Sequence, residues 1–484
     1  MENFNRERAE EIHQRILAQR PSICQETHIL WDFIMASEYE LILYMVSQKV
    51  WQGVVPPPPA NFEPGNGSIE LGMFRYWAQD PLLLDLSGFD WEDAAAIVGL
   101  CLTIDGCAPS SQLTDVNYGF FKNNELIYTD GSVLGMEKYA TYDQGWFIAF
   151  LNLLQTFINY NWYNRGNFPT VDPPVIPLSG ASSNEVNIAL VGDWGTGDAT
   201  AQAVMKQLVS LNPDYIVHVG DVYYSGSPLA GDPNASIYFS PGEEGTNLIE
   251  GWPSSYAGKS FTLNSNHEMY SGANGYFYDA LLPQGSFFSA QKGSSCWALQ
   301  YGGWTILGLD SAFMGSSLDA FMSGSLGGAD GVQRKWITSL NLDPDKVIVL
   351  THHNGFSPDG KMLTSLWEEI IGTFNKKAPY AWYWGHVHYG IVYNCPMVIQ
   401  GVRIPTYARC LGHGALPYGL ASSLSDAPVA WSCTNKDSNN PPQLANGFAM
   451  LTLKTYEEGQ LISLIESFYD ISTNKVAWSM DLLK

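Results

Sequence analysis

The feature that most constrains the fold is an alternation of short apolar runs with amphipathic helical segments in the second part of the chain. VNIALVG is followed by ATAQAVMKQLVSL and DYIVHVG, and KVIVLTH is followed by MLTSLWEEIIGTF and AWYWGH. Such alternation is typical of βαβ units, in which helices cover a sheet. Hairpins or a meander at the sheet edges are indicated by CWALQYGGWTILGLD and by the closing runs FAMLTLKTY, QLISLIESFYD and KVAWSMDLL. We therefore predict an α/β fold class with mixed sheets.

The first 165 residues have a different pattern. Apolar side chains follow helical spacing over residues 4–19 and 29–49. Residues 166–183 are dense in Pro, Gly and Ser, which interrupts regular structure and indicates a domain boundary. We predict three parts, which are a mostly helical N-terminal domain of unknown role over 1–165, a linker over 166–183 and a second domain over 184–484.

Charge and cysteine content exclude several classes of function. The 484 residues include 24 Lys and Arg against 48 Asp and Glu, which gives a formal net charge of −24. This balance disfavours nucleic acid, or an anionic membrane surface, as the main partner. The 7 cysteines form no CxxC or CxxxC pair, so neither a disulfide scaffold nor a thiolate zinc site is indicated.

Two segments bear on membranes and location. The first twenty residues carry charges throughout and lack the apolar stretch of a secretory signal, which predicts a cytoplasmic protein. Residues 144–164 carry no charge, but Asn152, Gln155 and Asn159 would be costly in hydrocarbon. We predict a buried amphipathic helix there and no transmembrane segment. Its apolar face would pack against the second domain or against a protein partner.

Polar side chains fall where the predicted strands end, often in turns flanked by glycine. Strand ends are where open α/β sheets place ligands. Taken singly, such a position is more often a capped loop or a core histidine than a functional site, but five in one order are hard to attribute to chance. The five are Asp193 in GDWG, Asp221 in GDVYY, the run Asn266-His267-Glu268, His352 with His353 after VLT, and His386 with His388 in GHVH.

These motifs resemble the calcineurin-like metallophosphoesterases, and within that superfamily they are most similar to the purple acid phosphatases. The resemblance covers residues 186 to about 390. Most members of the superfamily carry Asp-x-His, whereas this sequence has Asp193-x-Gly195 and a tyrosine, Tyr224, three residues after Asp221. Purple acid phosphatases carry the same pair of changes, in which a phenolate replaces the lost imidazole. The resemblance implies a four-layer sandwich of two mixed β-sheets flanked by helices, with 184–484 as the catalytic domain.

The resemblance also implies a binuclear metal centre. It assigns Asp193, Tyr224 and His388 to a first metal, Asn266, His352 and His386 to a second metal, and Asp221 to a bridge between them. Phenolate, carboxylate and imidazole suit Fe(III), and an amide oxygen with two imidazoles suits divalent Fe, Zn or Mn. Three negative ligand charges against five positive metal charges leave the centre positive, so that it would attract a phosphate group.

The implied reaction is hydrolysis of a small phosphorylated substrate, a monoester first, by hydroxide that the metals supply. His267 matches the family position that contacts phosphate, where it would stabilise the transition state or protonate the leaving alkoxide. The alternative is a histidine that only orients Asn266 and Glu268. The acidic segment Ser225–Trp252 is predicted to line or cover the site, which disfavours a highly charged substrate such as a polyphosphate.

Other interpretations stay open from the sequence. One is a phosphodiesterase with two divalent ions, in which Tyr224 is only a nearby phenol. Another is a non-catalytic metal-binding scaffold whose helical N-terminal domain binds a partner. GxxxxGK[ST] and GxSxG motifs do not occur, so a nucleotide cofactor or a serine nucleophile is not indicated. His413, in a Gly-His-Gly turn, is predicted to be an exposed loop residue, and His218 a hydrogen-bonded core residue.

Overall fold

The structure is a computed structural model. It describes residues 173–484, except for 183, 230–237, 239, 284, 317–319, 438–442, 457–458 and 474, and before them residues 120–122, 125–128, 138–139, 146, 149, 152–153 and 156. The helices predicted over 4–19 and 29–49, and most of the predicted N-terminal domain, lie outside the described residues. Of the helix predicted within 144–164, the five described residues have helical conformation.

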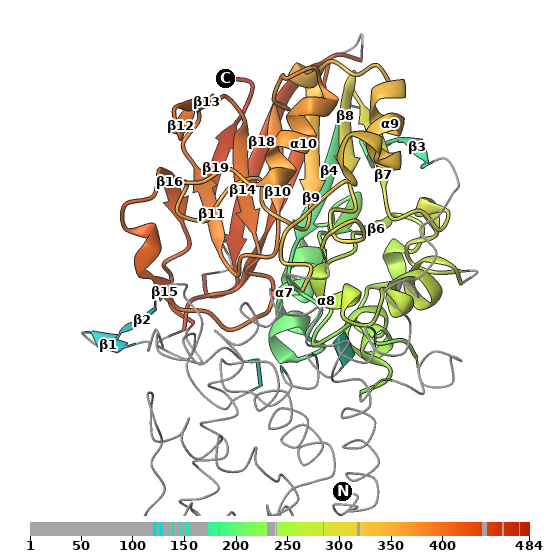
Figure 1. Ribbon diagram of the computed structural model, residues 1–484, viewed down its shortest axis with the longest axis vertical. Coiled ribbons are helices and arrows are strands. Elements are labelled where there is room, and N and C mark those ends of the chain that lie inside the picture. The colour runs from blue at the N-terminus through green and yellow to red at the C-terminus, as the bar shows by residue number, and fades with distance from the viewer. Residues whose placement is uncertain are drawn as a thin grey trace, which may run out of the picture.

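Two mixed sheets face each other at the centre of the described part of the chain (Figure 1). The first has six strands in the order β19 (Lys475–Asp481), β18 (Leu461–Asp470), β17 (Gly447–Thr455), β4 (Glu185–Val191), β5 (Tyr215–His218) and β6 (Ser260–Thr262). The second has eight strands in the order β16 (Val429–Ser432), β11 (Gly390–Tyr393), β14 (Tyr407–Leu411), β10 (Ala381–Trp384), β9 (Val347–Thr351), β8 (Trp304–Gly308), β7 (Trp297–Tyr301) and β3 (Val175–Pro177). A further two-stranded sheet pairs β12 (Met397–Ile399) with β13 (Val402–Ile404).

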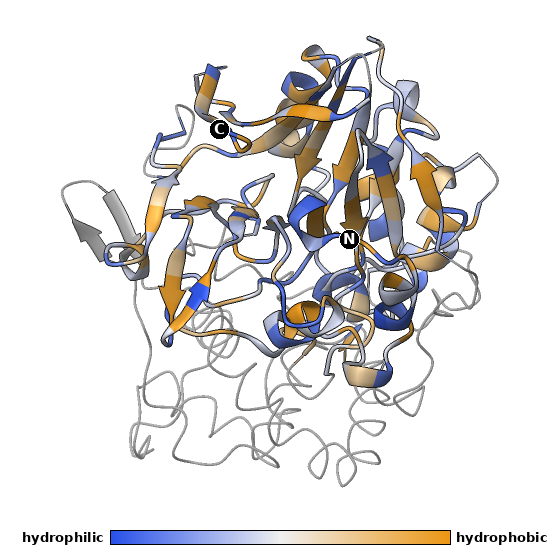
Figure 2. Ribbon diagram, turned by 90° about the horizontal axis from the view of Figure 1, so that it is seen from above, coloured by the Kyte–Doolittle hydropathy of each residue, from blue (hydrophilic) through white to orange (hydrophobic). Residues whose placement is uncertain are grey.

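One apolar core fills the space between the two sheets. In β4, the alternate residues Ile188 and Leu190 point into it, and Leu299 and Leu350 meet them from β7 and β9. All four side chains are fully buried. Figure 2 shows hydrophobic residues along the central strands of the described part of the chain. Burial of side chains of this size contributes about 1.5–3 kcal/mol each, so this core holds the sheets together.

Helices cover the outer faces of both sheets. The helix α7 (Ala199–Ser210) begins at Asp198, whose side chain accepts a hydrogen bond from the Ala201 amide (2.9 Å), and it packs near β17. The helices α9 (Val332–Ser339) and α10 (Ser365–Thr373) cover the eight-stranded sheet, where Trp367 and Ile370 are buried. The result is the predicted four-layer arrangement of helix, sheet, sheet and helix. None of the helices in the described part of the chain is both long enough and apolar enough to span a bilayer.

The strand pairings confirm the predicted units. The strands β4 and β5 are parallel and joined by α7, and β9 and β10 are parallel and joined by α10. The strands β7 and β8 form the predicted antiparallel hairpin. The strands β17, β18 and β19 form the predicted antiparallel meander at one edge of the six-stranded sheet. Local patterns were sufficient for these elements because each of them buries a regular apolar face.

Two segments that precede residue 184 pair with strands that follow it. The strand β3 lies inside the predicted linker and pairs with β7, so regular structure begins earlier than the sequence indicated. Within the region predicted to be mostly helical, β1 (Phe120–Lys122) and β2 (Glu125–Tyr128) form a hairpin, and β2 also pairs with β15 (Leu420–Ala421). The division of the chain into separate domains stays a prediction.

Candidate metal centre

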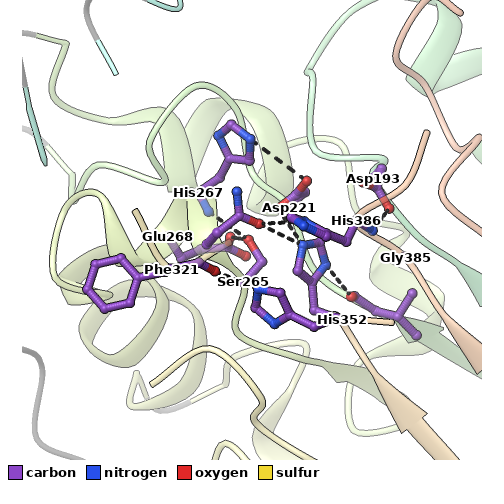
Figure 3. A network of polar contacts seen from close by, with 12 residues as sticks. Asp193, Asp221, Ser265, His267, Glu268, Phe321, His352, Gly385 and His386 are labelled. Carbon is purple, nitrogen blue, oxygen red and sulfur yellow. Dashed lines mark hydrogen bonds and ion pairs between the residues drawn. The ribbon is translucent and has the colours of Figure 1, made fainter. Parts of the chain in front are cut away.

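The polar side chains predicted at strand ends meet at one end of the sandwich. Asp193, Asp221 and Asn266 follow β4, β5 and β6, and His352 and His386 follow β9 and β10. Figure 3 shows the side chains of Asp221, His352 and His386 pointing toward one another from different loops. The carboxyl ends of parallel strands lie at the same edge of a sheet, so the order of these motifs in the chain translates into one cluster in space.

Three of these residues have an unusual backbone conformation. Asp193, Asp221 and His386 have φ angles of 55°, 77° and 65°, in the left-handed region that non-glycine residues rarely adopt. Each such residue costs roughly 1–3 kcal/mol and persists only where its surroundings hold it. The Asp193 carboxylate accepts a hydrogen bond from the His386 amide at 2.9 Å, which holds two of these turns together. The strained turns direct all three side chains into one centre.

Gly195 is required by the close approach of two loops. Its amide donates to the Asp221 carbonyl (3.1 Å), and its own carbonyl accepts from the Tyr223 amide (2.8 Å). A Cβ atom at this position would lie 2.5 Å from the Asp221 carbonyl oxygen and 2.8 Å from Val222 Cα. The resemblance to purple acid phosphatases relates Gly195 to the loss of an imidazole ligand. The close approach of the two loops gives the same glycine a steric role.

One half of the centre gathers the acceptor atoms predicted for the second metal. Asn266 Oδ1 lies 2.8 Å from His352 Nε2 and 3.1 Å from His386 Nδ1. Asp221 Oδ1 lies 3.1 Å from the same His352 Nε2. An amide oxygen, a carboxylate oxygen and ring nitrogens therefore converge within hydrogen-bond distance.

The protonation of His352 shows that this arrangement fits a cation. His352 Nδ1 lies 3.0 Å from the Val219 carbonyl, which can only accept, so Nδ1 carries the proton. Burial is the main cause that lowers the pKa of His352 to about 3, so its Nε2 presents a lone pair to the oxygens of Asn266 and Asp221. None of the described residues donates a hydrogen bond to Asp221 Oδ1. A metal ion at this point would satisfy all three acceptors.

The other half of the centre contains the groups predicted for the first metal. The phenol hydroxyl there belongs to Tyr223, which lies 3.2 Å from Asp193 Oδ1, 2.7 Å from Asp221 Oδ2 and 3.1 Å from His388 Nε2. His388 Nε2 lies 3.5 Å from Asp193 Oδ1. Asp221 therefore directs one oxygen to each half of the centre.

The pKa values of the acidic groups in this half of the centre depend strongly on burial and on neighbouring charges. Burial, and then the charge of Asp221, raise the pKa of Asp193 well above its usual value. Burial opposes ionisation of Asp221 as well, and only protonated imidazoles at His352 and His267 would outweigh it and hold the pKa of Asp221 well below its usual value. Burial and the two carboxylates raise the pKa of the Tyr223 phenol. A cation would favour ionisation of all three groups.

The position of Tyr224 differs from that of its neighbour. Its carbonyl lies 2.5 Å from His267 Nδ1, and its ring centroid lies 4.8 Å from that of Tyr139 and 5.0 Å from that of Trp146. The predicted ligands Asp193, Asp221, Asn266, His352, His386 and His388 are thus brought together, and the phenol among them is one residue before the predicted one. Metal binding by Tyr224 stays a prediction.

His267 lies at the rim of the centre. The short helix α8 (Asn266–Met269) begins at Ser265, whose hydroxyl accepts from the His267 amide (3.1 Å) and donates to the Glu268 carboxylate. Ser265 is therefore the N-cap residue of this helix. It directs Asn266 into the cluster and leaves His267 Nε2 at 4.0 Å from Asp221 Oδ2. The extended backbone of Ser265 (φ −135°, ψ 178°) accommodates its side chain.

Three further histidines are structural. His353 bonds the Phe321 carbonyl through Nε2 (2.7 Å) and the Ser311 hydroxyl through Nδ1 (2.9 Å), although a ligand atom of its ring lies within 4.8 Å of those of His352 and His386. His218 is a core residue that pairs with Thr262, as predicted. The prediction of an exposed His413 is wrong, because this side chain is fully buried and its ring lies near Phe468 and Tyr418.

Two of the acidic residues of Ser225–Trp252, Glu243 and Glu244, point into the protein. Glu243 Oε2 accepts from the Ser225 amide and hydroxyl (both 2.8 Å), so it organises the loop after Tyr224. Glu244 is fully buried, and burial followed by the Glu268 charge raises its pKa. Glu250 is exposed and Asp232 lies outside the described residues. The two buried carboxylates therefore do not support the predicted acidic lining of the site.

Sequence reasoning missed two aromatic residues beside the centre, Tyr139 and Trp146. The Trp146 ring centroid lies 5.7 Å from that of His267 and 5.8 Å from that of Tyr223. The only signal in the sequence was the predicted apolar face within 144–164, which did not indicate what that face would cover.

Comparison with known proteins finds a family match over the segment that carries the motifs. Residues 186–390 match the family described as calcineurin-like phosphoesterase. Among solved structures, the chain is similar to GAP50, the anchor in the inner membrane complex of Plasmodium, at 13% identity over 62% of this chain and 88% of that chain, with a TM-score of 0.42. It is also similar to Yfce, a phosphoesterase from E. coli, at 13% identity over 61% of this chain and 100% of that chain, with a TM-score of 0.26. None of the curated proteins matches the sequence.

The family match covers the segment in which the motifs lie. The match at residues 186–390 supports the predicted calcineurin-like phosphoesterase superfamily for this part of the chain, and the purple acid phosphatase subtype stays a prediction. The residues that this part of the chain gathers at its strand ends fit a pair of metal ions.

Proposed function

We propose that this protein hydrolyses phosphate esters, monoesters first, at a binuclear metal centre of the purple acid phosphatase type. The observation that carries the proposal is the buried convergence of acceptor atoms in a phosphoesterase domain. His352 Nε2 faces Asn266 Oδ1 at 2.8 Å and Asp221 Oδ1 at 3.1 Å while its proton is held on the other nitrogen. A cation would satisfy acceptors gathered in this way.

The proposed ligand sets follow from the two halves of the centre. Asn266, His352 and His386 would hold one metal, and Asp193 and His388 with a tyrosine phenol would hold the other. The contacts of the two Asp221 oxygens with opposite halves support its role as the bridge. When bound, two such metals polarise the phosphoryl oxygens and supply a nucleophile at neutral pH.

The identity of the metals rests on the phenol. A phenolate beside carboxylates and an imidazole suits Fe(III), and the amide with two imidazoles suits divalent Fe, Zn or Mn. The resemblance assigns the phenol to Tyr224, whereas the contacts of the Tyr223 hydroxyl with Asp193, Asp221 and His388 favour Tyr223. We propose Tyr223 as the phenolate ligand.

His267 is the proposed proton donor to the leaving alkoxide. Its Nδ1 donates to the Tyr224 carbonyl, which fixes the orientation of the ring and leaves Nε2 turned toward Asp221. A proton on Nε2 would then face the oxygen that leaves the phosphoryl group. General acids of this kind contribute roughly 10²–10⁴-fold to the rate.

The test combines metal content with the kinetics of two variants. We expect wild-type protein to contain about two metals per chain and to hydrolyse para-nitrophenyl phosphate. His267→Ala should keep both metals and lose about 100-fold or more in kcat with an alkyl phosphate, whose leaving group needs a proton, but lose less with para-nitrophenyl phosphate. Asn266→Ala should lose metal as well as activity.

Each alternative has a distinct result. Full activity of His267→Ala on alkyl phosphates would remove the proton-donor role. Preference for diesters over monoesters would favour the divalent phosphodiesterase, and wild-type protein that binds metals without hydrolysing esters would support a binding scaffold instead.

A further inference from the structure

We propose that Trp146, held from the N-terminal region, forms the wall of the substrate pocket on the leaving-group side and selects esters of aromatic alcohols. The inference rests on the proposed function and extends it to the substrate class. It also assigns a role to a segment that lies outside the calcineurin-like match at residues 186–390.

The described residues of this segment lie along one side of a helix. They are Trp146, Ala149, Asn152, Leu153 and Thr156, and their spacing of three or four brings them onto the same face. All except Trp146 are buried, whereas Trp146 is half-buried. The face is therefore packed against the phosphoesterase domain, and Trp146 is its partly accessible end.

Two hydrogen bonds fix this face to the loops of the metal centre. Asn152 Nδ2 donates to Ser225 Oγ at 2.7 Å, and Thr156 Oγ1 donates to the Tyr270 carbonyl at 2.7 Å. Ser225 directly follows the tyrosine pair, and Tyr270 directly follows α8. The segment is thus fixed to both loops that present groups to the substrate.

Trp146 is the member of this face that reaches the reacting groups. Its ring stands edge-on to Tyr224 at 5.0 Å and to Tyr223 at 5.8 Å, and it lies 5.7 Å from the His267 ring. Tyr139 supports it from behind, with its ring 6.2 Å from Trp146 and its hydroxyl donating to the Thr196 carbonyl at 2.6 Å. Tyr139 is itself buried, so the wall is rigid on the protein side.

The position beside His267 determines which part of a substrate meets the indole. The phosphoryl group would lie on the metals, and the alcohol would leave toward the proton donor His267. The alcohol portion therefore continues past the His267 ring, where Trp146 lies. An indole offers dispersion and ring contacts to an aromatic alcohol but no ionised group to replace the water of a charged or polyhydroxy alcohol.

The test compares Trp146→Ala, Trp146→Phe and the exposed-aromatic control Tyr456→Ala in the full chain. Wild-type protein should favour phenyl phosphate over glycerol 2-phosphate. In Trp146→Ala, we expect kcat/KM for phenyl phosphate to fall about tenfold through KM, and the ratio between the two substrates to fall about fivefold. Trp146→Phe should retain most of that ratio. Inhibition by inorganic phosphate should change less than about twofold, because phosphate would contact the metals and His267 and would not reach the indole.

A binding measurement separates this inference from the proposed function. Phenylphosphonate and methylphosphonate are not hydrolysed, and calorimetry should show that Trp146→Ala loses affinity for the phenyl compound alone. An equal loss for both compounds, or for phosphate, would reduce Trp146 to a structural role and overturn the proposal, as would unchanged binding of both. Wild-type protein that binds phenylphosphonate through Trp146 but hydrolyses no ester would instead refute the proposed function and leave the binding wall intact.

Discussion

Tyr223 and Tyr224 are adjacent and chemically identical, yet the polar contacts of the Tyr223 hydroxyl set its position apart from that of the Tyr224 ring. The Tyr223 hydroxyl lies among two carboxylates and an imidazole, while the Tyr224 ring packs against Tyr139 and Trp146. A motif that counts residues from Asp221 selects the second tyrosine. The direction of the backbone after Asp221 decides which of the two side chains enters the centre. The number of residues between Asp221 and a tyrosine does not contain this information.

This difference predicts the colour of two matched variants. A phenolate on Fe(III) gives a charge-transfer band in the visible range, so iron-loaded Tyr223→Phe should lose the band while Tyr224→Phe keeps it. Each change removes one oxygen atom, and each variant is the control for the other. The absorption spectrum and iron content are measured on the same samples. Loss of the band in Tyr224→Phe alone would return the ligand role to the predicted residue.

At the scale of elements, the site depends on loops that touch through backbone atoms. The loop after β4 and the loop after β5 are joined through Gly195, Asp221 and Val222. A side chain at Gly195 would clash with this contact, because its Cβ would lie 2.5 Å from the Asp221 carbonyl oxygen. The same two loops carry Asp193 and Asp221 in strained conformations. Separation of the loops would therefore move two ligands at once.

Gly195→Ala should consequently lower both the free energy of unfolding and the metal content. We expect a loss of about 2 kcal/mol or more, because the clash is with backbone that cannot rotate away. The control is Gly303→Ala, where φ is 77° and no atom lies within 4 Å of the added Cβ. That change introduces only backbone strain and should cost about 1 kcal/mol with metal content unchanged. Denaturant unfolding compares the two, and an equal loss in both variants would refute the steric explanation.

At the scale of the whole molecule, the centre connects the two sheets. Asp193, Asp221 and Asn266 follow strands of the six-stranded sheet, and His352 and His386 follow strands of the eight-stranded sheet. Metals held between them would link the two halves of the sandwich in the folded state only. Metal binding should therefore stabilise the entire domain and not one loop.

Removal of metal by a chelator should lower the midpoint of thermal unfolding, and reconstitution should restore it. A ligand that binds only the native state at 100 times its Kd stabilises it by about 2.7 kcal/mol. The double variant Asn266→Ala and His352→Ala should respond to neither treatment. Equal midpoints of chelated and reconstituted wild-type protein would show that the acceptor cluster does not bind metal in the native state.

The sequence by itself determined the βαβ units, the hairpin, the meander and the positions of the carboxylates and imidazoles at the strand ends. These features are local, because an apolar period of two or 3.6 residues specifies the element and a polar residue after a buried strand falls at the sheet edge. Only the tertiary structure decided that Tyr223 enters the centre, that His413 is buried and that Trp146 reaches His267. Each of these depends on contacts between segments far apart in the chain or on the direction of a strained turn. Such contacts produce no periodic pattern in the sequence, because the side chains that pack together are determined by their shapes and by the space available in the folded chain.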